Sequence, residues 1–357
     1  VLPKVLQRRR GRGPHRRSRA ASPAMASQDA DLPGALWRGD GAQEVPRLHE
    51  IRAVATDMDG TFLGPDHAAP AAALEAARRL EAAGVPLLFA TGRNRASAQG
   101  RLEAAVDLAA RPGVFLNGAV VYGGRGAVIH ERTVSADVVA DVLRHTEESA
   151  AAGKCSVVLC RGDDHFVPDL ASPWAMHLHR EYDDPSPKSL GGWAAAVSSY
   201  SSVGGGAPEQ KRAKVEEPHL LHVVASREEL DVMRVPLEAL CGARVKSARS
   251  LPTCLTLLHP SCSKADGLIP ALKELGVEAR DTLALGDAEN DIEMLQEVGI
   301  GVAVGNAMPK VKAGVVWRCA ANSADPPGVA RVLRAVVAAR AAHAESAPKS
   351  AGVAASA

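Results

Sequence analysis

The sequence predicts an α/β protein whose core is a parallel sheet with helices on its faces. Three short apolar runs, 51–55, 86–90 and 282–285, have the length and composition of buried strands. Between the first two, the Ala/Leu/Glu/Arg pattern of 71–83 predicts a helix that ends at Gly84. Strands that alternate with helices in this way are typical of a parallel sheet.

Further elements extend this core on either side of a long insertion. Residues 114–116 form another expected strand, and 119–122 and 127–130 flank the turn Gly123-Gly124-Arg125-Gly126, a pattern that predicts a hairpin. The core resumes near residue 261, and it ends with expected helices over 266–275 and 328–342.

The insertion, residues 134–260, predicts a separate α+β domain. Its expected helices cover 137–150 and 227–240, the second despite Pro236. Short β-type runs make up the rest, at 156–160, 219–225, 243–247 and 254–258. Residues 198–218 are rich in Ser, Gly and Pro and are expected to form a flexible loop within this domain.

Both ends of the chain have the composition of disordered segments. Residues 1–49 are polar and rich in Pro and Gly, and 343–357 are of low complexity. The first 24 residues are rich in Arg and contain no acid, which resembles an organelle transit peptide. Met25 is a plausible start of the protein, so residues 1–24 are slightly more plausible as translated upstream sequence than as a transit peptide. A basic nucleic-acid-binding arm is the weakest interpretation of these residues. We expect a cytoplasmic protein or, if the leader is a transit peptide, a plastid or other organelle protein.

The composition narrows the classes of partner. Of the 357 residues 46% are apolar, which suits a buried core, and the formal net charge of +1 gives no reason to expect nucleic acid. No run of 18 apolar residues indicates a membrane span. None of the six cysteines forms a C-x-x-C pair, so reduced thiols are expected, and Cys262 near Lys264 is expected to be inert. We expect a monomer or weak homodimer.

The strongest candidate for chemistry is Asp57-Met58-Asp59-Gly60-Thr61, directly after the first predicted strand. Two carboxylates two residues apart suit a nucleophile, Asp57, with a proton-transfer group, Asp59, beside it. Gly60 lets the chain turn sharply. The alternative is a solvated acidic turn.

Three later segments suit a phosphate and metal site. Thr91-Gly92-Arg93 offers a hydroxyl and backbone N–H groups after the second strand, which predicts a phosphate cradle. Lys264, before a helix, can supply a fixed positive charge, and Asp287 with Asp291 suits Mg²⁺. Each has an alternative: an N-cap for Thr91, a surface position for Lys264, and helix-start roles for the two acids. That all the alternatives hold together in this order is improbable.

The order D-x-D-G-T, T-G-R, S-K and G-D-x-x-N-D resembles the haloacid dehalogenase superfamily of phosphatases. The segments 116–119 and 302–307, with Val311-Lys312, are similar to its Cof-type branch, subclass IIB. The resemblance covers roughly residues 51–334. It implies a Rossmann-like doubly wound core made of 50–133 and 261–342, with an inserted α+β cap of the C2B type at 134–260.

The resemblance also implies a reaction and a role for each motif residue. Asp57 would form an aspartyl-phosphate, and Asp59 would be the general acid and base. The implied sets are Asp57, Asp59 (through its backbone carbonyl) and Asp287 for Mg²⁺; Thr91, Gly92, Lys264 and Asn306 for phosphate; and Asn290 and Asp291 for orienting the metal waters and the lysine. The substrate would be a small phosphorylated metabolite, such as a sugar phosphate, flavin mononucleotide or its pyrimidine precursor, or pyridoxal phosphate.

Two other functions stay open, as does the leaving-group pocket. A phosphomutase or phosphotransferase would use the same scaffold, and a catalytically silent binding module would need none of the motifs. In the cap, Trp174, His177, His179 and Arg180 are candidates for lining the pocket, although surface or packing roles are favoured for them. For Asn306, holding its loop is the alternative to a phosphate contact.

Overall fold

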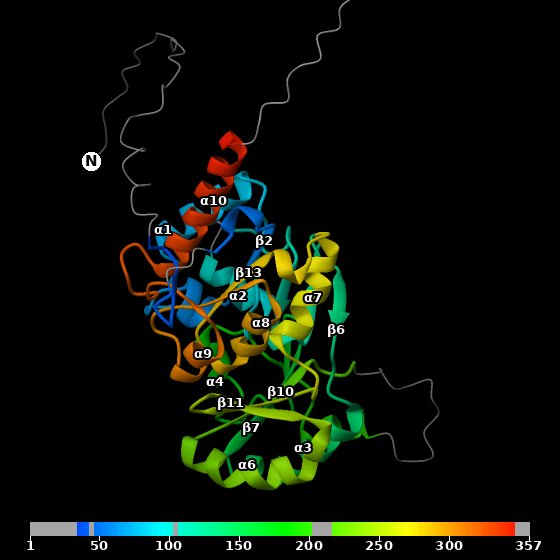
Figure 1. Ribbon diagram of the computed structural model, residues 1–357. Coiled ribbons are helices and arrows are strands. Elements are labelled where there is room, and N and C mark those ends of the chain that lie inside the picture. Colours follow the sequence, from blue (N-terminus) through cyan, green and yellow to red (C-terminus); the bar gives the residue numbers. More distant parts are fainter. Residues whose placement is uncertain (1–33, 43–45, 103–105, 202–215, 347–357) are drawn as a thin grey trace, which may run out of the picture.

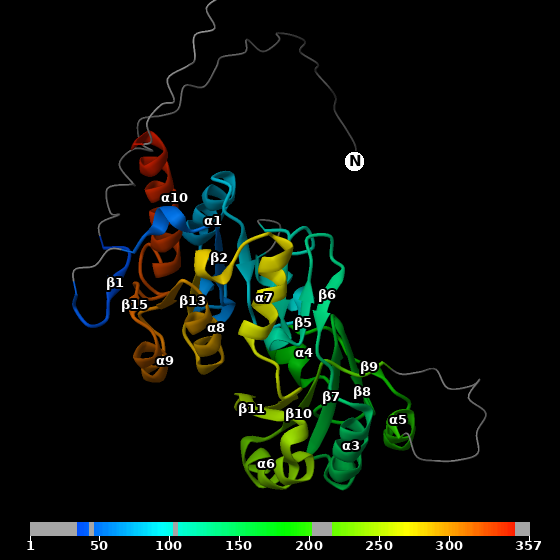
Figure 2. The same ribbon diagram turned by 45° about the vertical axis from the view of Figure 1, so that its right-hand side comes forward.

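The computed structural model describes residues 34–42, 46–102, 106–201 and 216–346. Two lobes stand one above the other in Figure 1, and the chain passes between them near Thr133 and again near His259. The upper lobe holds a parallel sheet, and the lower lobe is the inserted segment (Figure 2).

The upper lobe is built on a six-stranded sheet in the order β1-β15-β14-β13-β2-β3. All neighbours in it are parallel except β1, which pairs antiparallel with β15. The strands are β1 (Trp37–Arg38), β2 (Ala53–Thr56), β3 (Leu87–Phe89), β13 (Thr282–Gly286), β14 (Ile300–Ala303) and β15 (Trp317–Arg318). In the central strands β2, β3, β13 and β14 the side chains are mostly apolar and almost all buried, and together with the parallel pairing this confirms the predicted parallel sheet.

Helices cover both faces of this sheet, which confirms the doubly wound arrangement. On one face α1 packs against α10, and on the other α7 packs against α8 (Figure 1). Buried alanines on both α1 and α10 let these helices approach closely. The helices of this lobe are α1 (Ala71–Ala82), α2 (Arg95–Leu102), α7 (Lys264–Glu274), α8 (Ile292–Glu297), α9 (Pro309–Gly314) and α10 (Gly328–Ser346).

A small antiparallel sheet extends the upper lobe. It consists of β4 (Gly113–Phe115), β5 (Val120–Tyr122) and β6 (Val128–Glu131). The β5–β6 pairing confirms the predicted hairpin. A parallel bridge between Ala90 and Val114 connects β4 to the end of β3.

The lower lobe is a six-stranded sheet in the order β11-β12-β10-β7-β8-β9, with helices α3, α5 and α6 on its outer face. The strands are β7 (Cys155–Arg161), β8 (Asp164–Val167), β9 (Lys188–Ser189), β10 (Leu220–Ala225), β11 (Lys246–Leu251) and β12 (Cys254–Leu258). The helices are α3 (Ala136–Ala151), α4 (His177–Tyr182), α5 (Trp193–Tyr200) and α6 (Arg227–Cys241). Ser226 caps α6 by accepting a hydrogen bond from the N–H of Glu229 at 3.2 Å. This lobe has the predicted α+β character.

Order extends further than predicted near the N-terminus. Within the expected disordered segment 1–49, Trp37 and Arg38 pair with β15, and Leu48 is buried in the core next to α10. Trp37 and Arg38 are ordered by the edge of β15, and Leu48 is ordered by its contact with α10. Both partners are far away in the sequence, so local composition does not reveal them. Residues 1–33 and 43–45 lie outside the described residues.

Four other boundaries differ from the predictions. Helix α10 continues to Ser346, four residues into the expected tail 343–357. Helix α5 runs to Tyr200, and Glu217 accepts hydrogen bonds from Thr133 and Ala136, so both ends of the expected loop 198–218 are ordered. Residues 202–215 and 347–357 lie outside the described residues. The strand expected at 243–247 starts only at Lys246, after a short helical turn. The helix expected from 266 begins at Lys264, because Ser263 caps it.

Among the helices of the described residues, none is both long enough and apolar enough to cross a bilayer.

Candidate active site

The motif residues converge at one edge of the parallel sheet. Strands β14, β13, β2 and β3 are neighbours, and their carboxyl ends lead into the segments that hold Asn306, Asp287, Asp57 and Thr91. The carboxyl edge of an open parallel sheet is where such folds bind ligands. The sheet therefore brings together residues that are up to about 250 positions apart in the sequence.

A buried lysine joins two of the acidic motifs. The Nζ atom of Lys264 lies 2.5 Å from Oδ1 of Asp57 and 2.6 Å from Oδ1 of Asp291. Lys264 is 1% exposed because α7 begins with its side chain turned into the core. Burial by itself lowers the pKa of this ammonium group, but the two carboxylates outweigh burial and raise it. Lys264 therefore stays charged, and the surface-lysine alternative is wrong.

Both carboxylate oxygens of Asp291 accept hydrogen bonds from neighbouring groups. Besides Lys264, it accepts hydrogen bonds through Oδ2 from the N–H groups of Asp287 and Ala288, both at 2.9 Å. A Cβ atom on Gly286 would lie 2.5 Å from that of Asp291, so glycine is required there. These contacts fit a residue that orients the lysine and the loop better than one that binds a metal directly.

Asp291 and two neighbouring aspartates form a cluster with excess negative charge. Carboxylate oxygens of Asp57, Asp287 and Asp291 lie within 4.8 Å of one another. Burial raises the pKa of Asp57 well above its usual range; Lys264 opposes this effect, and the two neighbouring acids reinforce it. Burial, and then the charge of Asp291, also raises the pKa of Asp287. One ammonium group does not balance three carboxylates, so the donor set fits a divalent cation that prefers oxygen ligands.

The turn after Asp57 is shaped around Asp287. Gly60 has φ +81°, and a Cβ atom at this position would collide with the carboxylate of Asp287. Thr61 donates a hydrogen bond from Oγ1 to Oδ1 of Asp287 at 3.0 Å. The glycine and threonine of the D-x-D-G-T motif therefore hold the two candidate metal ligands together.

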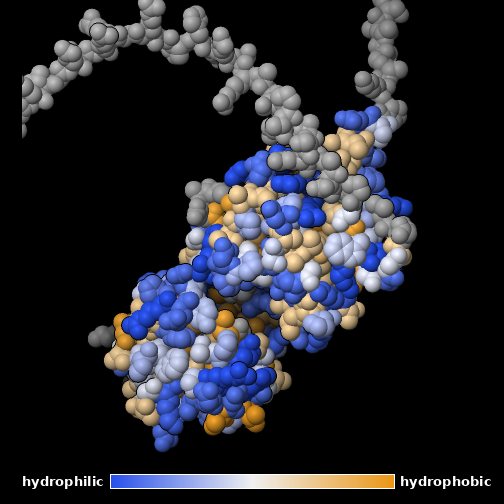
Figure 3. Space-filling model, turned by 90° about the vertical axis from the view of Figure 1, so that its left-hand side faces the viewer, coloured by the Kyte–Doolittle hydropathy of each residue, from blue (hydrophilic) through white to orange (hydrophobic). Residues whose placement is uncertain are grey.

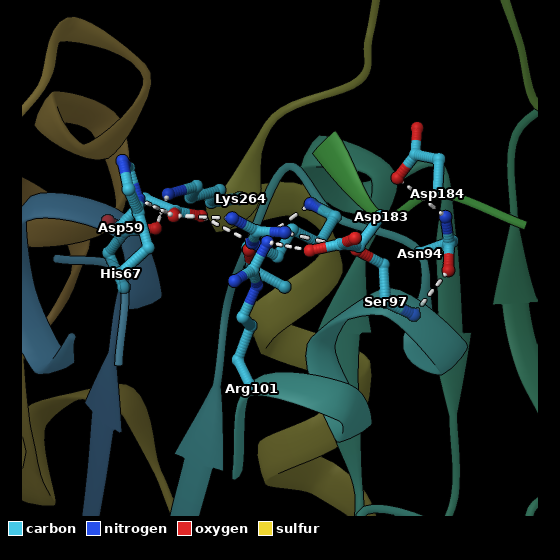
Figure 4. A network of polar contacts seen from close by, with 11 residues as sticks. Asp59, His67, Asn94, Ser97, Arg101, Asp183, Asp184 and Lys264 are labelled. Atoms are coloured by element: carbon cyan, nitrogen blue, oxygen red, sulfur yellow. Dashed lines mark hydrogen bonds and ion pairs between the residues drawn. The ribbon is translucent and has the colours of Figure 1, made fainter. Parts of the chain in front are cut away.

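The side chain of Asp59 points away from this cluster. Arg93 donates hydrogen bonds from Nε and Nη2 to its two carboxylate oxygens, each at 2.7 Å, and Nδ1 of His67 lies 3.1 Å from Oδ1 (Figure 4). Burial raises the pKa of Asp59, but Arg93 and His67 outweigh burial, so the pKa is lowered. In this structure Asp59 is an ionised carboxylate paired with arginine. No motif in the sequence indicates this role of His67.

Thr91 and Gly92 lie at the carboxyl end of β3, next to the segment that holds Asn117. Thr91 is buried, and its Oγ1 accepts a hydrogen bond from the N–H of Arg93 at 3.2 Å. Gly92 packs against the side chain of Asn117, where a Cβ atom would be only 3.3 Å from the amide. The Nδ2 group of Asn290 donates to Oδ1 of Asn117 at 2.9 Å, which ties the β13 loop to the β4 end.

Asn306 supports the first motif. Its Nδ2 donates to the carbonyl of Gly60 at 2.7 Å, and its Oδ1 accepts from the N–H of Asn322 at 2.9 Å. Both ends of the amide are used within the protein, which favours the loop-holding alternative over a phosphate contact.

The cap residues singled out from the sequence mainly serve packing. The Nε2 atom of His177 lies 2.9 Å from Oγ1 of Thr253, and its ring packs edge-on against Trp174. Nδ1 of His179 lies 2.7 Å from the carbonyl of Asp184, and Arg180 is exposed.

All six cysteines, each within the described residues, are buried thiols. Burial raises the pKa of Cys262 to about 12, in line with the expectation that it is inert.

The chain matches a known protein family. A family model described as haloacid dehalogenase-like hydrolase matches residues 54–333. This chain belongs to that family. An HMP-PP phosphatase of Shigella flexneri serotype 5b is 30% identical over 263 residues, 73% of this chain and 87% of the relative. An HMP-PP phosphatase of Enterobacter sp. (strain 638) is 29% identical over 73% of this chain and 86% of its own length.

Solved structures share the fold. A Thermotoga maritima protein aligns with TM-score 0.65 at 21% identity, over 79% of this chain and 96% of its own. A subclass IIB sugar phosphatase aligns with TM-score 0.60, also at 21% identity, over 79% and 98%. The predictions of a Cof-type member, of its Rossmann-like fold and of a phosphatase are confirmed.

Proposed function

We propose that this chain is a Mg²⁺-dependent phosphatase that hydrolyses a small phosphorylated metabolite through an aspartyl-phosphate on Asp57. The observation that carries this proposal is the buried contact of Asp57 with Lys264, at the sheet edge where Asp287 adds a further carboxylate. Phosphatases among the relatives support the same class of substrate.

Asp57 is the nucleophile in this proposal. A bond forms from its carboxylate oxygen to phosphorus while the bond from phosphorus to the leaving oxygen breaks. Asp57, Asp287 and the backbone carbonyl of Asp59 would hold Mg²⁺, which when bound neutralises the cluster and lets Asp57 stay ionised despite its burial. Lys264 keeps one oxygen of Asp57 in place and stabilises the negative charge of the transferring group.

Asp59 supplies the proton to the leaving oxygen and later takes one from the attacking water. It needs a proton first, yet Arg93 lowers its pKa in this structure. The substrate phosphate is a second anion that competes for the Arg93 guanidinium. When Arg93 turns toward the phosphate, the pKa of Asp59 rises and the carboxyl can act as an acid.

A phosphate-release assay tests this function. Purified protein is incubated with p-nitrophenyl phosphate and with a panel of phosphorylated metabolites that includes HMP-PP, each with and without Mg²⁺. Metal-dependent release of inorganic phosphate is expected. Transfer of the phosphoryl group to a sugar hydroxyl without release would instead indicate a phosphotransferase, and no turnover of any ester would indicate a binding module.

A further inference from the structure

One face of the cap sheet looks toward the phosphatase core. In β10, Leu220 and Val224 belong to the hydrophobic cluster that includes the core strands, whereas Leu221 and Val223 belong to the separate cluster beneath α3 and α6. Because side chains alternate along a strand, His222 lies on the core-facing side. It is the polar member of this apolar strand on that side.

Two side chains contact the Nδ1 atom of His222. Its Nδ1 atom lies 2.9 Å from Oγ1 of Thr256, its cross-strand partner, and 3.2 Å from Sγ of Cys254. A hydroxyl and a thiol can both donate to Nδ1, and we assign the ring proton to Nε2 on this basis. Thr256 and Cys254 are fully buried, whereas His222 is only half-buried. Within the described part of the chain, Nε2 of His222 has no hydrogen-bond partner.

This face stands over the phosphate cradle. Nε2 of His165, from β8, lies 3.5 Å from Nδ2 of Asn94, the residue directly after Thr91-Gly92-Arg93. Asn94 also donates to Asp184 of the cap at 3.3 Å (Figure 4). His165 is close enough to influence the charge of His222. In Figure 3 the two lobes are separated by a recess where apolar and polar side chains meet.

The two histidines of this face are uncharged, and the nearest acidic group is Asp184, which shares Asn94 with His165 and whose pKa burial raises to about 6. Burial lowers the pKa of His165 to about 4 and that of His222 to about 3, so both rings are neutral near pH 7. The cross-strand partners of His222 are Thr256 and Val158. Lys246 lies on the same face, but in the edge strand β11, where it pairs with Glu293 at 3.6 Å.

We propose that His222 is a specificity-determining residue whose Nε2–H donates a hydrogen bond to an uncharged part of the leaving group. This rests on the proposed function, because it presumes that the phosphoryl group is held at Asp57. An acceptor such as a hydroxyl, carbonyl or ring nitrogen would pair with Nε2. A second anionic group at this point would lose its hydration without gaining a counter-charge.

The experiment compares His222→Ala with the wild-type full chain on p-nitrophenyl phosphate, pyridoxal phosphate, flavin mononucleotide, and the pair fructose 6-phosphate and fructose 1,6-bisphosphate. For the best metabolite, kcat/KM should fall about tenfold or more, the worth of one good hydrogen bond, mainly through a higher KM. For p-nitrophenyl phosphate it should change less than twofold. His222→Gln, which keeps a donor, should recover part of the loss.

Two further variants guard against a general structural effect. His177→Ala is the matched control, since His177 is another half-buried cap histidine bonded to a threonine hydroxyl. It should leave the ratio of metabolite to p-nitrophenyl phosphate activity unchanged. Thr256→Val removes the hydroxyl that contacts Nδ1 of His222. It should therefore lower the ratio of metabolite to p-nitrophenyl phosphate activity, as His222→Ala does. This variant tests the proposal if His222→Ala fails to fold.

An unchanged ratio in His222→Ala and Thr256→Val would overturn the role of His222. A wild-type preference for the bisphosphate over the monophosphate by tenfold would overturn the claim that the part of the leaving group next to His222 is uncharged. Both results differ from failure of the proposed function, in which the wild type would release no phosphate even from p-nitrophenyl phosphate.

Discussion

Replacing Asp57 by asparagine is the most direct perturbation of the proposed chemistry. Asp57 is 5% exposed and in contact with Lys264, so the reacting oxygen has a fixed position. An amide in the same place is not a nucleophile and cannot form the acyl phosphate. We expect phosphate release to fall on the order of a thousandfold or more, about 4 kcal/mol or more in the activation barrier.

The same variant should fold normally. Asp57→Asn removes a buried carboxylate that is costly to ionise, and Lys264 keeps its contact with Asp291 at 2.6 Å. These effects oppose each other, so the free energy of unfolding should change by about 1–2 kcal/mol at most. The assay is steady-state hydrolysis of p-nitrophenyl phosphate with Mg²⁺, alongside a thermal melt.

A matched control comes from the helix that carries Lys264. Asp266 is a half-buried aspartate that bonds to Arg132 and His130, so Asp266→Asn should keep activity within a few-fold of the wild type. If Asp57→Asn retained activity within tenfold of the wild type while folded, Asp57 would not be the nucleophile and the mechanism would be refuted.

Three further outcomes test the site and the cap. EDTA should stop phosphate release and Mg²⁺ should restore it, with Ca²⁺ much less effective because it favours looser coordination; full activity in metal-free protein would contradict this. Arg93→Gln should raise the pKa of Asp59 and move the alkaline limb of the kcat–pH profile to higher pH, and an unmoved limb would show that Asp59 does not set it. Stability should fall as the pH drops from about 6.5 toward about 4, because His165 takes up a proton more readily in the unfolded chain than in the fold. Denaturant titrations at pH 7, 5 and 4 should show a loss of up to about 3 kcal/mol, which His165→Asn should reduce.

The core was largely predictable from the sequence because its signals are local. Each catalytic segment follows a short apolar run, and the carboxyl ends of adjacent parallel strands meet at one edge. The strand after Ile51, the helix before Gly84 and the hairpin around Gly123 each have a composition that their own segment explains. The structure brings Asp57, Asp287 and Lys264 together as this logic requires.

Other features depend on partners far away in the sequence. Trp37 becomes a strand because β15 offers an edge, and Leu48 is buried because α10 passes above it. The pairing of Asp59 with Arg93 spans 34 positions, and neither the D-x-D nor the T-G-R motif indicates it alone. The division at 134 and 260, and the roles assigned to Asn290 and Asn306, stay predictions.

In the cap, a polar residue within an apolar strand is more informative than a cluster of aromatic and basic residues. His177 and Trp174 stood out because aromatic and basic residues cluster around them, yet that cluster packs onto itself. His222 is the polar residue of the apolar strand Leu220–Ala225, and a polar residue at a core-facing position needs either a partner or a ligand. Thr256 satisfies one ring nitrogen of His222, and the other has no hydrogen-bond partner among the described residues. We therefore expect an isolated polar position in an alternating strand to indicate leaving-group recognition better than local residue clustering does.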